Sequence, residues 1–312
     1  MSILIQYTLI FTAVLAIVAL GGMFSERSGV INLGLEGCMV IGALGGALVL
    51  RYLPTGTNPF LVVVLAILGA VISGVLYSLL LAVAAINFGA DQTITGTALN
   101  ILAPAFATVL VKAITLSESG KASPRIDYAS LQPAFTFHIG SFECNWFVVI
   151  AIFLTIFSYF FLSRRRTGLR LKACGEHPQA AASVGINVIK MRYLGVIISG
   201  AFAGIGGLAF ICSASTVWSF DNGVVGFGFL ALAVMIFGKW NPITILLGAL
   251  LFGFFRSFGN VYQSFDWIKN LGINGKVYNM LPYIVCLVVL AVTQKKSHAP
   301  KAEGIPYDRG RR

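Results

Sequence analysis

One stretch decides the fold class: Asn145-Trp-Phe-Val-Val-Ile-Ala-Ile-Phe-Leu-Thr-Ile-Phe-Ser-Tyr-Phe-Phe-Leu-Ser163, followed at once by Arg164-Arg-Arg166. The stretch carries no charged side chain. A helix of roughly 20 mostly apolar residues is long enough to cross the hydrocarbon core of a bilayer, which is about 30 Å thick. Basic residues directly after such a helix are typical of its cytoplasmic end. The sequence therefore predicts a membrane-spanning helix here, with its carboxyl end in the cytoplasm.

Similar apolar segments recur along the whole chain. We expect spans near 4–23, 31–50, 60–86, 93–112, 145–163, 193–213, 226–238, 242–259 and 278–293. The seventh is short, and the fourth contains Pro104, so either could be a broken or re-entrant segment. The chain is thus predicted to be an all-α polytopic membrane protein with about nine transmembrane helices, in a range of eight to ten.

The composition agrees with this fold class. Apolar residues make up 57% of the 312 residues and charged residues only 11%, whereas ordinary globular proteins have about 25% charged residues. A water-soluble fold is therefore excluded. Glycines four residues apart, Gly42 with Gly46 and Gly200 with Gly204, predict places where two helices pack closely in lipid, because a missing Cβ lets backbones approach.

The net charge of +11 is an orientation signal rather than a sign of nucleic-acid binding. Of the 22 basic residues, 13 lie in the 164–192 loop and the 294–312 tail: Arg164, Arg165, Arg166, Arg170, Lys172, Lys190, Arg192, Lys295, Lys296, Lys301, Arg309, Arg311 and Arg312. Both regions belong in the cytoplasm by the positive-inside rule. Counting back through five spans then puts the N-terminus outside. We predict an N-out, C-in topology, with a transmembrane domain over 1–293 and a basic cytoplasmic tail over 294–312.

Sequence patterns of enzymes are missing. No GxxxxGK[ST] loop is present, since Gly238-Lys239 is followed by Trp240, and neither HExxH nor GxSxG occurs. The five cysteines lie far apart, with no zinc or disulfide spacing. No basic residue precedes the first apolar run, so we expect that span to stay in the mature protein. These observations predict no catalytic residue, no metal site and no cofactor in this chain, and leave a transporter or a channel.

The basic loop contains a short predicted helix. Pro178 suits the first turn of a helix, Glu176 is acidic at its positive end, and Gly185 is a stop signal. A helix of about two turns over 178–184 is too short to be stable alone. We expect its small face, Ala180 to Ala182, to dock into a groove on a cytoplasmic partner; the alternative is a plain basic loop that only fixes orientation.

Four blocks of the sequence carry a resemblance to a known family. The loop reads Gly175-Glu-His-Pro-Gln-Ala-Ala-Ala-Ser-Val-Gly-Ile186, and the other blocks are Glu26 to Gly37, Ile198 to Gly207 and Gly304 to Arg312. They resemble the permease subunits of bacterial ABC importers of the ribose, simple-sugar and nucleoside type, with the nucleoside branch most similar. The loop is similar to that family's GENPxAAxxxGI pattern except that His177 replaces Asn, and the four blocks together cover nearly the whole chain.

The resemblance implies a membrane subunit of an ATP-driven importer in the bacterial plasma membrane. This chain would form half of a pathway for nucleosides or simple sugars, beside a second permease, an ABC ATP-binding subunit that uses ATP and magnesium, and an extracytoplasmic substrate-binding lipoprotein. The coupling residues carried over are Gly175, Glu176, His177, Pro178, Ala181, Ala182 and Gly185. A secondary transporter or channel is the alternative; paired intramembrane charges would be expected there, whereas Glu36 stands nearly alone.

Polar residues within or beside the spans are candidates for the substrate pathway, because they are costly in lipid. Glu36 is expected on the same helical side as Asn32, four residues earlier. Thr95 and Asn100 belong to a polar strip near Pro104, and Trp218 and Asn222 follow the sixth span. For each candidate a structural role remains open: pairing within the bundle, helix-helix hydrogen bonding or interfacial anchoring.

Overall fold

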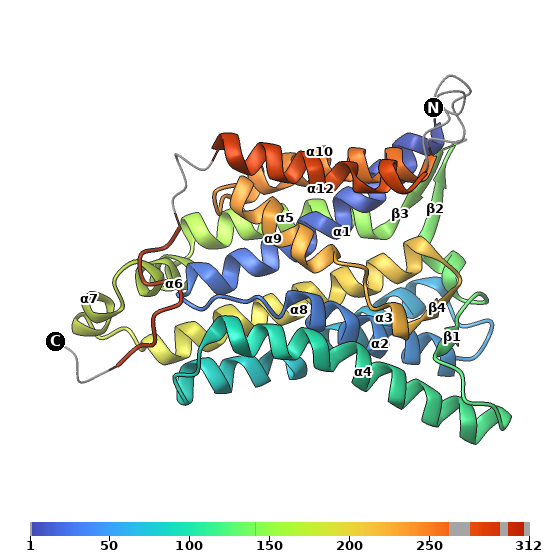
Figure 1. Cartoon of the computed structure of the whole chain (residues 1–312), viewed down its shortest axis with the longest axis horizontal. Coiled ribbons are helices and arrows are strands. Elements are labelled where there is room, and N and C mark those ends of the chain that lie inside the picture. Colours follow the sequence, from blue (N-terminus) through green and yellow to red (C-terminus); the bar gives the residue numbers. More distant parts are fainter. Residues whose placement is uncertain (1, 141, 262–274, 294–298, 309–312) are drawn as a thin grey trace.

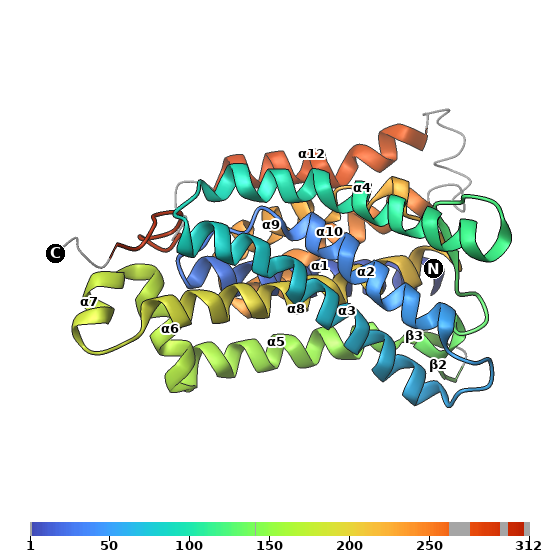
Figure 2. The same ribbon diagram turned by 90° about the horizontal axis from the view of Figure 1, so that it is seen from below.

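The computed structural model describes residues 2–140, 142–261, 275–293 and 299–308. Its long helices run side by side along one direction (Figures 1 and 2). They are α1 (Ser2–Arg27), α2 (Leu35–Tyr52), α3 (Pro59–Ala82) with a π turn over Val83–Asn87, α4 (Gln92–Ser119), α5 (Trp146–Arg164), α8 (Val188–Ala214), α10 (Pro242–Val261) and α12 (Gly275–Thr293). Three helices are shorter: α6 (Arg166–Glu176), α7 (Pro178–Ser183) and α9 (Phe227–Phe237).

Two small antiparallel sheets lie between the long helices in sequence. Strand β1 (Arg125–Asp127) pairs with β4 (Val217–Ser219), and β2 (Thr136–Ile139) pairs with β3 (Phe142–Asn145). Short 3-10 turns cover Gln132–Phe135 and Phe220–Asn222. The sheets lie at the end of the bundle that also holds the N-terminus, whereas α6, α7 and the C-terminal segment lie at the opposite end (Figure 1).

The prediction of an all-α protein with many spans is confirmed. Among the described residues, seven helices are long and apolar enough to cross a membrane: α1, α2, α3, α4, α5, α8 and α10. Helices α9 and α12 occupy the seventh and ninth predicted segments. With 11 residues, α9 rises only about 16 Å at 1.5 Å per residue, so it cannot cross a 30 Å core by itself.

The structure corrects three boundaries. The fourth segment is not broken, because α4 continues without interruption through Pro104. The second helix begins at Leu35 and not at residue 31, since residues 28–34 are non-helical. The loop 164–192 is largely helical: α6 fills its first half, and α8 begins at Val188. Helix α4 can continue past Pro104 because a proline removes only one backbone hydrogen bond, and neighbouring helices can hold the backbone at that point.

Glycines bring the central helices together as predicted. Helix α8 is the most enclosed span, with 78% of its most apolar window buried, against 28% for α3 and α4. A Cβ at Gly42 of α2 would overlap the Cα of Gly204 on α8, and a Cβ at Gly204 would overlap the carbonyl oxygen of Ala70 on α3. The predicted close packing at small residues is therefore present, and it brings the backbones of α2, α3 and α8 into contact.

Candidate functional site

Two helices begin inside the bundle rather than at its ends. After α1 the chain turns back through residues 28–34, and α2 starts only at Leu35. The non-helical backbone is held by α4: Gln92 Oε1 accepts from Ile31 N at 2.7 Å, and Asn100 Nδ2 donates to Leu33 O at 2.7 Å. Asn100 Oδ1 also accepts from Gly37 N at 2.8 Å. Backbone groups exposed at membrane depth need such partners, because lipid offers none.

Glu36 caps the short helix α9. Its Oε1 accepts from Gly226 N at 2.7 Å, and its Oε2 accepts from Gly228 N at 2.6 Å. A carboxylate at a helix N-terminus satisfies free N–H groups and lies favourably in the helix dipole. The N-termini of α2 and α9 therefore meet at one point inside the bundle, joined by a single side chain.

The expectation that Asn32 and Glu36 share a helical face is wrong. Asn32 lies before α2 in the non-helical segment, so the i, i+4 relation does not apply. It is fully buried and donates through Nδ2 to Ser199 Oγ of α8 at 2.9 Å, while its Oδ1 has no hydrogen-bond partner among the described residues. Asn32 thus fastens the segment to α8, whereas Glu36 faces α9.

The predicted polar strip on α4 divides between two faces. Asn100 turns inward to the 28–34 segment, as described above. Thr95 and Thr97 are at least partly exposed and donate back to carbonyls of their own helix, Asp91 O at 2.7 Å and Thr93 O at 2.8 Å. Asp91 caps α4, because its Oδ1 accepts from Thr93 N and Ile94 N.

Trp218 and Asn222 lie on a segment that turns back into the bundle after α8. Trp218 belongs to β4; its indole Nε1 donates to Gly223 O at 3.2 Å and its ring meets Phe210 edge-on at 5.4 Å. The following 3-10 turn packs against α4, so that a Cβ at Gly223 would lie 4.0 Å from Pro104 Cβ. Asn222 is exposed on this turn. The segment then leads directly into α9.

The other end of α9 is held by residues that the sequence patterns did not single out. Lys239 and Trp240 have φ angles of 51° and 53°, a left-handed conformation that is costly for non-glycine residues. Trp240 Nε1 donates to Glu26 Oε2 at 2.6 Å, and Trp240 O accepts from Arg27 Nη2 at 3.1 Å. Since Glu26 and Arg27 end α1, the short helix α9 is fixed at both ends by charged side chains.

The predicted short helix in the basic loop is present as α7. It ends before Gly185, whose φ of 83° fits a glycine stop. The acidic residue has another role than expected: Glu176 ends α6 and pairs with Arg27 at 3.7 Å. Gly175 is pressed against α1, because a Cβ there would overlap Arg27 O.

The expected smooth docking face of α7 is not one face. Successive helical residues point about 100° apart, and Ala181 is buried against Cys174 and Val188 of the same chain. Pro178 is buried as well, whereas His177 and Ala180 are exposed and Ala182 is half-buried. Half of α7 is therefore used to hold the helix in place.

The C-terminal segment 299–308 lies on this region. Ala302 N donates to Gly175 O at 2.8 Å, and Gly304 N donates to Gly29 O at 3.3 Å. The carboxyl group of Glu303 is hydrogen-bonded to that of Glu26. Burial raises the pKa of Glu303, while the hydrogen bond with Glu26 and the charge of Arg27 act in the opposite direction. Two carboxyl groups that share a hydrogen bond need a proton between them.

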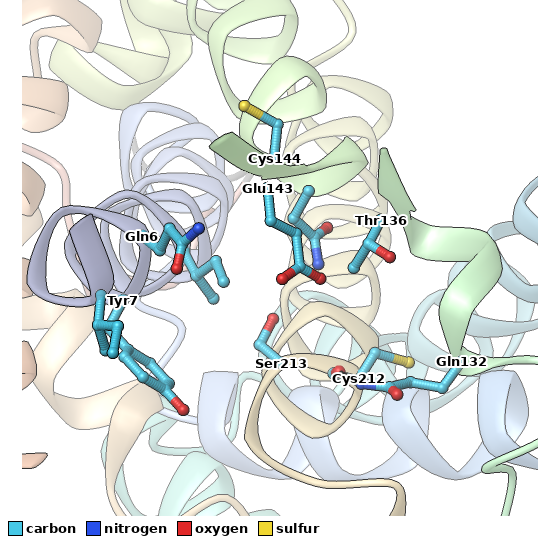
Figure 3. A pocket seen from close by; sticks show the side chains of 11 residues that line it. Gln6, Tyr7, Gln132, Thr136, Glu143, Cys144, Cys212 and Ser213 are labelled. Atoms are coloured by element: carbon cyan, nitrogen blue, oxygen red, sulfur yellow. Dashed lines mark hydrogen bonds between the residues drawn. The ribbon is translucent and has the colours of Figure 1, made fainter. Parts of the chain in front are cut away.

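A separate pocket opens at the end of the bundle that holds the N-terminus. Its cavity volume is about 310 Å³, and α1, the 3-10 turn over Gln132–Phe135, β2, β3 and α8 contribute to its wall. Figure 3 shows Gln6, Glu143 and Ser213 around one space. None of the sequence-predicted site residues lines it. Among the described residues, no group of three or more His, Cys, Asp or Glu side chains is arranged to hold a metal ion.

Residues 4–290 match the family described as the permease component of the branched-chain amino acid transport system. The chain belongs to this permease family. It is a multi-pass protein of the plasma membrane and a transport subunit, not an enzyme.

Curated relatives match the chain along its length. It is 39% identical to the guanosine ABC transporter permease protein NupQ of Bacillus subtilis, over 100% of this chain and 98% of that protein. It is 37% identical to the nucleoside ABC transporter permease protein NupC of Lactococcus lactis, over 98% and 97%. The guanosine ABC transporter permease protein NupP of B. subtilis is 23% identical, over 74% and 66%. No solved structure matches this chain.

Proposed function

We propose that this chain is one of two membrane subunits of an ATP-driven importer of nucleosides. The observation that carries the proposal is the full-length similarity to NupQ and NupC, whose names specify guanosine and nucleosides. The hydrogen-bonding amides and hydroxyls within the bundle suit a neutral nucleoside, and a simple sugar would use the same groups. Competition experiments must therefore decide between the two substrate classes.

The second membrane subunit is proposed to be a paralogue. NupQ and NupP carry the same transporter name in one bacterium, and this chain is similar to both at very different levels, 39% and 23%. That pattern is expected of a system with two unlike permeases. An ABC ATP-binding subunit would bind ATP and magnesium, and a substrate-binding lipoprotein would deliver the nucleoside from outside; this chain would need no cofactor of its own.

We assign the end of the bundle with α6, α7 and residues 299–308 to the cytoplasm. Arg164, Arg165, Arg166, Arg170, Lys190 and Lys301 all lie on elements of that end, as the positive-inside rule requires. The N-terminus at the opposite end is then outside (Figure 1). In this topology α9 and the re-entrant segment before it together form the seventh crossing, and α12 forms the ninth. Residues 1–293 make the transmembrane domain, with the tail beyond them.

Coupling to the ATP-binding subunit is assigned to α7 and its flanks: Gly175, Glu176, His177, Pro178, Ala181, Ala182 and Gly185. Two groups of contacts support this. Ala181 and Pro178 attach α7 to its own chain, while His177 and Gly185 are exposed to a partner. Gly175 and Glu176 connect the same region to Arg27 at the end of α1.

Motion at α7 would reach the middle of the bundle through α9. The route runs from Glu176 to Arg27 by an ion pair, from Arg27 and Glu26 to Trp240 by hydrogen bonds, and along α9 to Glu36 at the start of α2. A rigid helix held at both ends passes displacement from one end to the other. We propose α9 as the two-state element that ATP binding and substrate both bias.

The substrate pathway is proposed to pass the point where α2 and α9 begin. Helix N-termini inside a membrane leave backbone groups and polar side chains facing a cavity in many transporters. Asn32, Glu36 and Asn100 lie at this point, and Trp218 and Asn222 lie on the segment that leads to it. Thr95 is half-buried at the surface of the bundle, near the start of α4, where a second permease could cover it.

Uptake of labelled guanosine by the reconstituted assembly tests the substrate. Proteoliposomes that contain both permeases, the ATP-binding subunit and the lipoprotein should take up guanosine. Uptake should require ATP on the side of the membrane where the ATP-binding subunit lies. Unlabelled nucleosides should compete and free sugars should not. Competition by sugars alone would move the proposal to sugars, and uptake by this chain without any partner would support a secondary transporter or channel instead.

A further inference from the structure

The C-terminal segment is built into the region assigned to coupling. Besides its hydrogen bonds to Gly175 and Gly29, it contacts the α3–α4 connection, where Pro306 Cβ lies 3.9 Å from the position of a Cβ on Gly89. Gly304 has a φ of 76°, a conformation that residues with side chains rarely adopt, and a Cβ there would lie 2.8 Å from Cδ1 at the end of the Ile31 side chain. The segment therefore has one defined path across the end of the bundle.

Tyr307 joins this path to α7. Its side chain packs against the buried cluster of Cys174, Ala181 and Val188, which comes from α6, α7 and α8. A six-residue helix has too few internal hydrogen bonds to be stable alone, so α7 depends on this cluster. Because Tyr307 covers the cluster from the side of the tail, the C-terminal segment helps to hold α7 in position.

Tyr307 also forms one wall of a pocket. The pocket has a cavity volume of about 280 Å³, and its other walls include Ala182 of α7, residues 185–187 between α7 and α8, and Val188 and Ile189 at the start of α8. Most of these side chains are apolar. At an end of the bundle that faces water, a pocket of this size with several apolar side chains can receive an apolar side chain of another protein, although polar atoms line it as well.

The surroundings of the pocket indicate the charge of that protein. Lys190 and Lys301 are exposed on the two chain segments that border it, and Arg170 is exposed on the neighbouring α6. Of the acidic residues nearby, Glu176 at the end of α6 already pairs with Arg27, and Asp308 is exposed next to Tyr307, so the rim is mostly basic but includes one exposed carboxylate. Val184 beside the pocket is an apolar side chain with 74% of its surface exposed, and Ile305 near Tyr307 has 54% exposed. Apolar surface with a basic rim fits a partner with an apolar projection and acidic neighbours.

We propose that the ATP-binding subunit docks on a composite surface made of α7, the start of α8 and Tyr307, with an apolar side chain of that subunit in the pocket and acidic residues against Lys190 and Lys301. The inference rests on the proposed function, because it names further contacts for the same partner. It assigns the C-terminal segment two tasks: to hold α7 against the bundle and to complete the surface that the partner binds.

Photo-cross-linking in the whole assembly tests the composite surface. A photo-reactive phenylalanine derivative is placed at position 307, at 184 or at 60 of the full-length chain, which is co-expressed with its partners. We expect the ATP-binding subunit to be labelled from positions 184 and 307, and not from 60, since Phe60 lies in the first turn of α3, which begins at the opposite end of the bundle. Labelling from 184 without labelling from 307 would overturn the composite surface but leave the proposed function intact.

Two substitutions measure what Tyr307 contributes. Tyr307→Ala should weaken binding of the purified ATP-binding subunit about tenfold or more, whereas Tyr307→Phe, which keeps the ring, should bind as the unaltered chain does. Equal binding by the unaltered chain and Tyr307→Ala would overturn the inference. If the unaltered chain binds no ATP-binding subunit and position 184 labels none, the proposed function itself fails. Unchanged thermal melting of Tyr307→Ala in detergent shows that lost binding is not unfolding.

Discussion

Trp240 and Glu26 are joined by a hydrogen bond of 2.6 Å between the indole Nε1 and the carboxylate Oε2, although 214 positions separate them in the chain. The bond closes the end of α9 on the end of α1. Trp240 has a left-handed backbone conformation, which persists only where the surroundings fix it. The end of α9 is therefore held by its contacts with α1 and not by its own sequence.

Removing this hydrogen bond should separate ATP hydrolysis from uptake. Trp240→Phe keeps the aromatic bulk but leaves Glu26 without its donor, at a cost of about 1–3 kcal/mol for a buried polar group. We expect guanosine uptake by the reconstituted assembly to fall strongly while ATP hydrolysis continues. Trp146→Phe is the matched control, because Trp146 is an exposed indole outside both the proposed route and the substrate pathway. Equal loss of uptake in both variants would argue against a special role of the bond to Glu26.

The N-terminal end of α9 gives a second prediction. Glu36→Ala leaves the amides of Gly226 and Gly228 without acceptors in the bundle interior, which costs about 1–3 kcal/mol for each group. Glu36→Gln retains one oxygen acceptor and should cost less. We expect the melting temperature in detergent to fall by several degrees for Glu36→Ala and by less for Glu36→Gln. Glu118→Gln, at an exposed pair with Arg51, is the control and should have almost no effect.

A functional readout distinguishes capping from substrate contact at Glu36. If the carboxylate only caps α9, Glu36→Gln should change the maximal rate of uptake and leave the guanosine concentration for half-maximal uptake unchanged. A large change in that concentration with normal stability would show that Glu36 contacts the nucleoside. Both outcomes are read from one set of uptake curves at saturating ATP.

The sequence predicted the helices well and their interior contacts poorly, for physical reasons. Segments such as 145–163 are set by local hydropathy, which is readable along the chain. The segment at 31–34 directly precedes an apolar run, but it is non-helical, and Gln92, Asn100 and Ser199 of other helices hydrogen-bond to it. Nothing in local composition records those partners. For the same reason Asn32 was expected on a helix that begins three residues later.

Some parts of the candidate site could be read from the sequence and others could not. Helix α7 was predicted by Pro178 and Gly185, since start and stop signals are local. The role of Glu176 was not, because its partner Arg27 lies far away in the chain. Trp240 gave no pattern at all; the one available signal was the Gly-Lys-Trp-Asn-Pro sequence, which indicates a tight turn after an apolar run.

Close helix packing gives a third prediction. Gly204→Ala places a methyl group against the carbonyl of Ala70, which cannot move without shifting α3. Such overpacking costs about 1–3 kcal/mol. Gly248→Ala is the matched control, because its methyl group would meet the Phe237 ring at 2.8 Å, and a half-buried side chain can turn away more easily than a backbone. We expect lower melting temperature and lower yield for Gly204→Ala only; equal losses would show that α3 and α8 have more room than their backbones indicate.

Docking of the C-terminal segment should weaken as pH rises. Burial raises the pKa of Glu303, so the docked segment holds its proton more tightly than the free segment does, in which a glutamate has a pKa of about 4.3. The C-terminal segment is thus docked most stably at pH values below the pKa of the free glutamate. Its docking weakens as the pH rises from there to the raised pKa of the docked Glu303, and it changes no further above that pKa. The facing groups are Glu26 and Arg27, and both oppose the rise, Glu26 through its hydrogen bond and Arg27 through its charge. Hydrogen exchange at the amides of Ala302 and Gly304, corrected for intrinsic rates, should show protection that falls with pH. Glu303→Gln should remove most of this dependence and Glu118→Gln should keep it; an unchanged profile in Glu303→Gln would show that another group controls the segment.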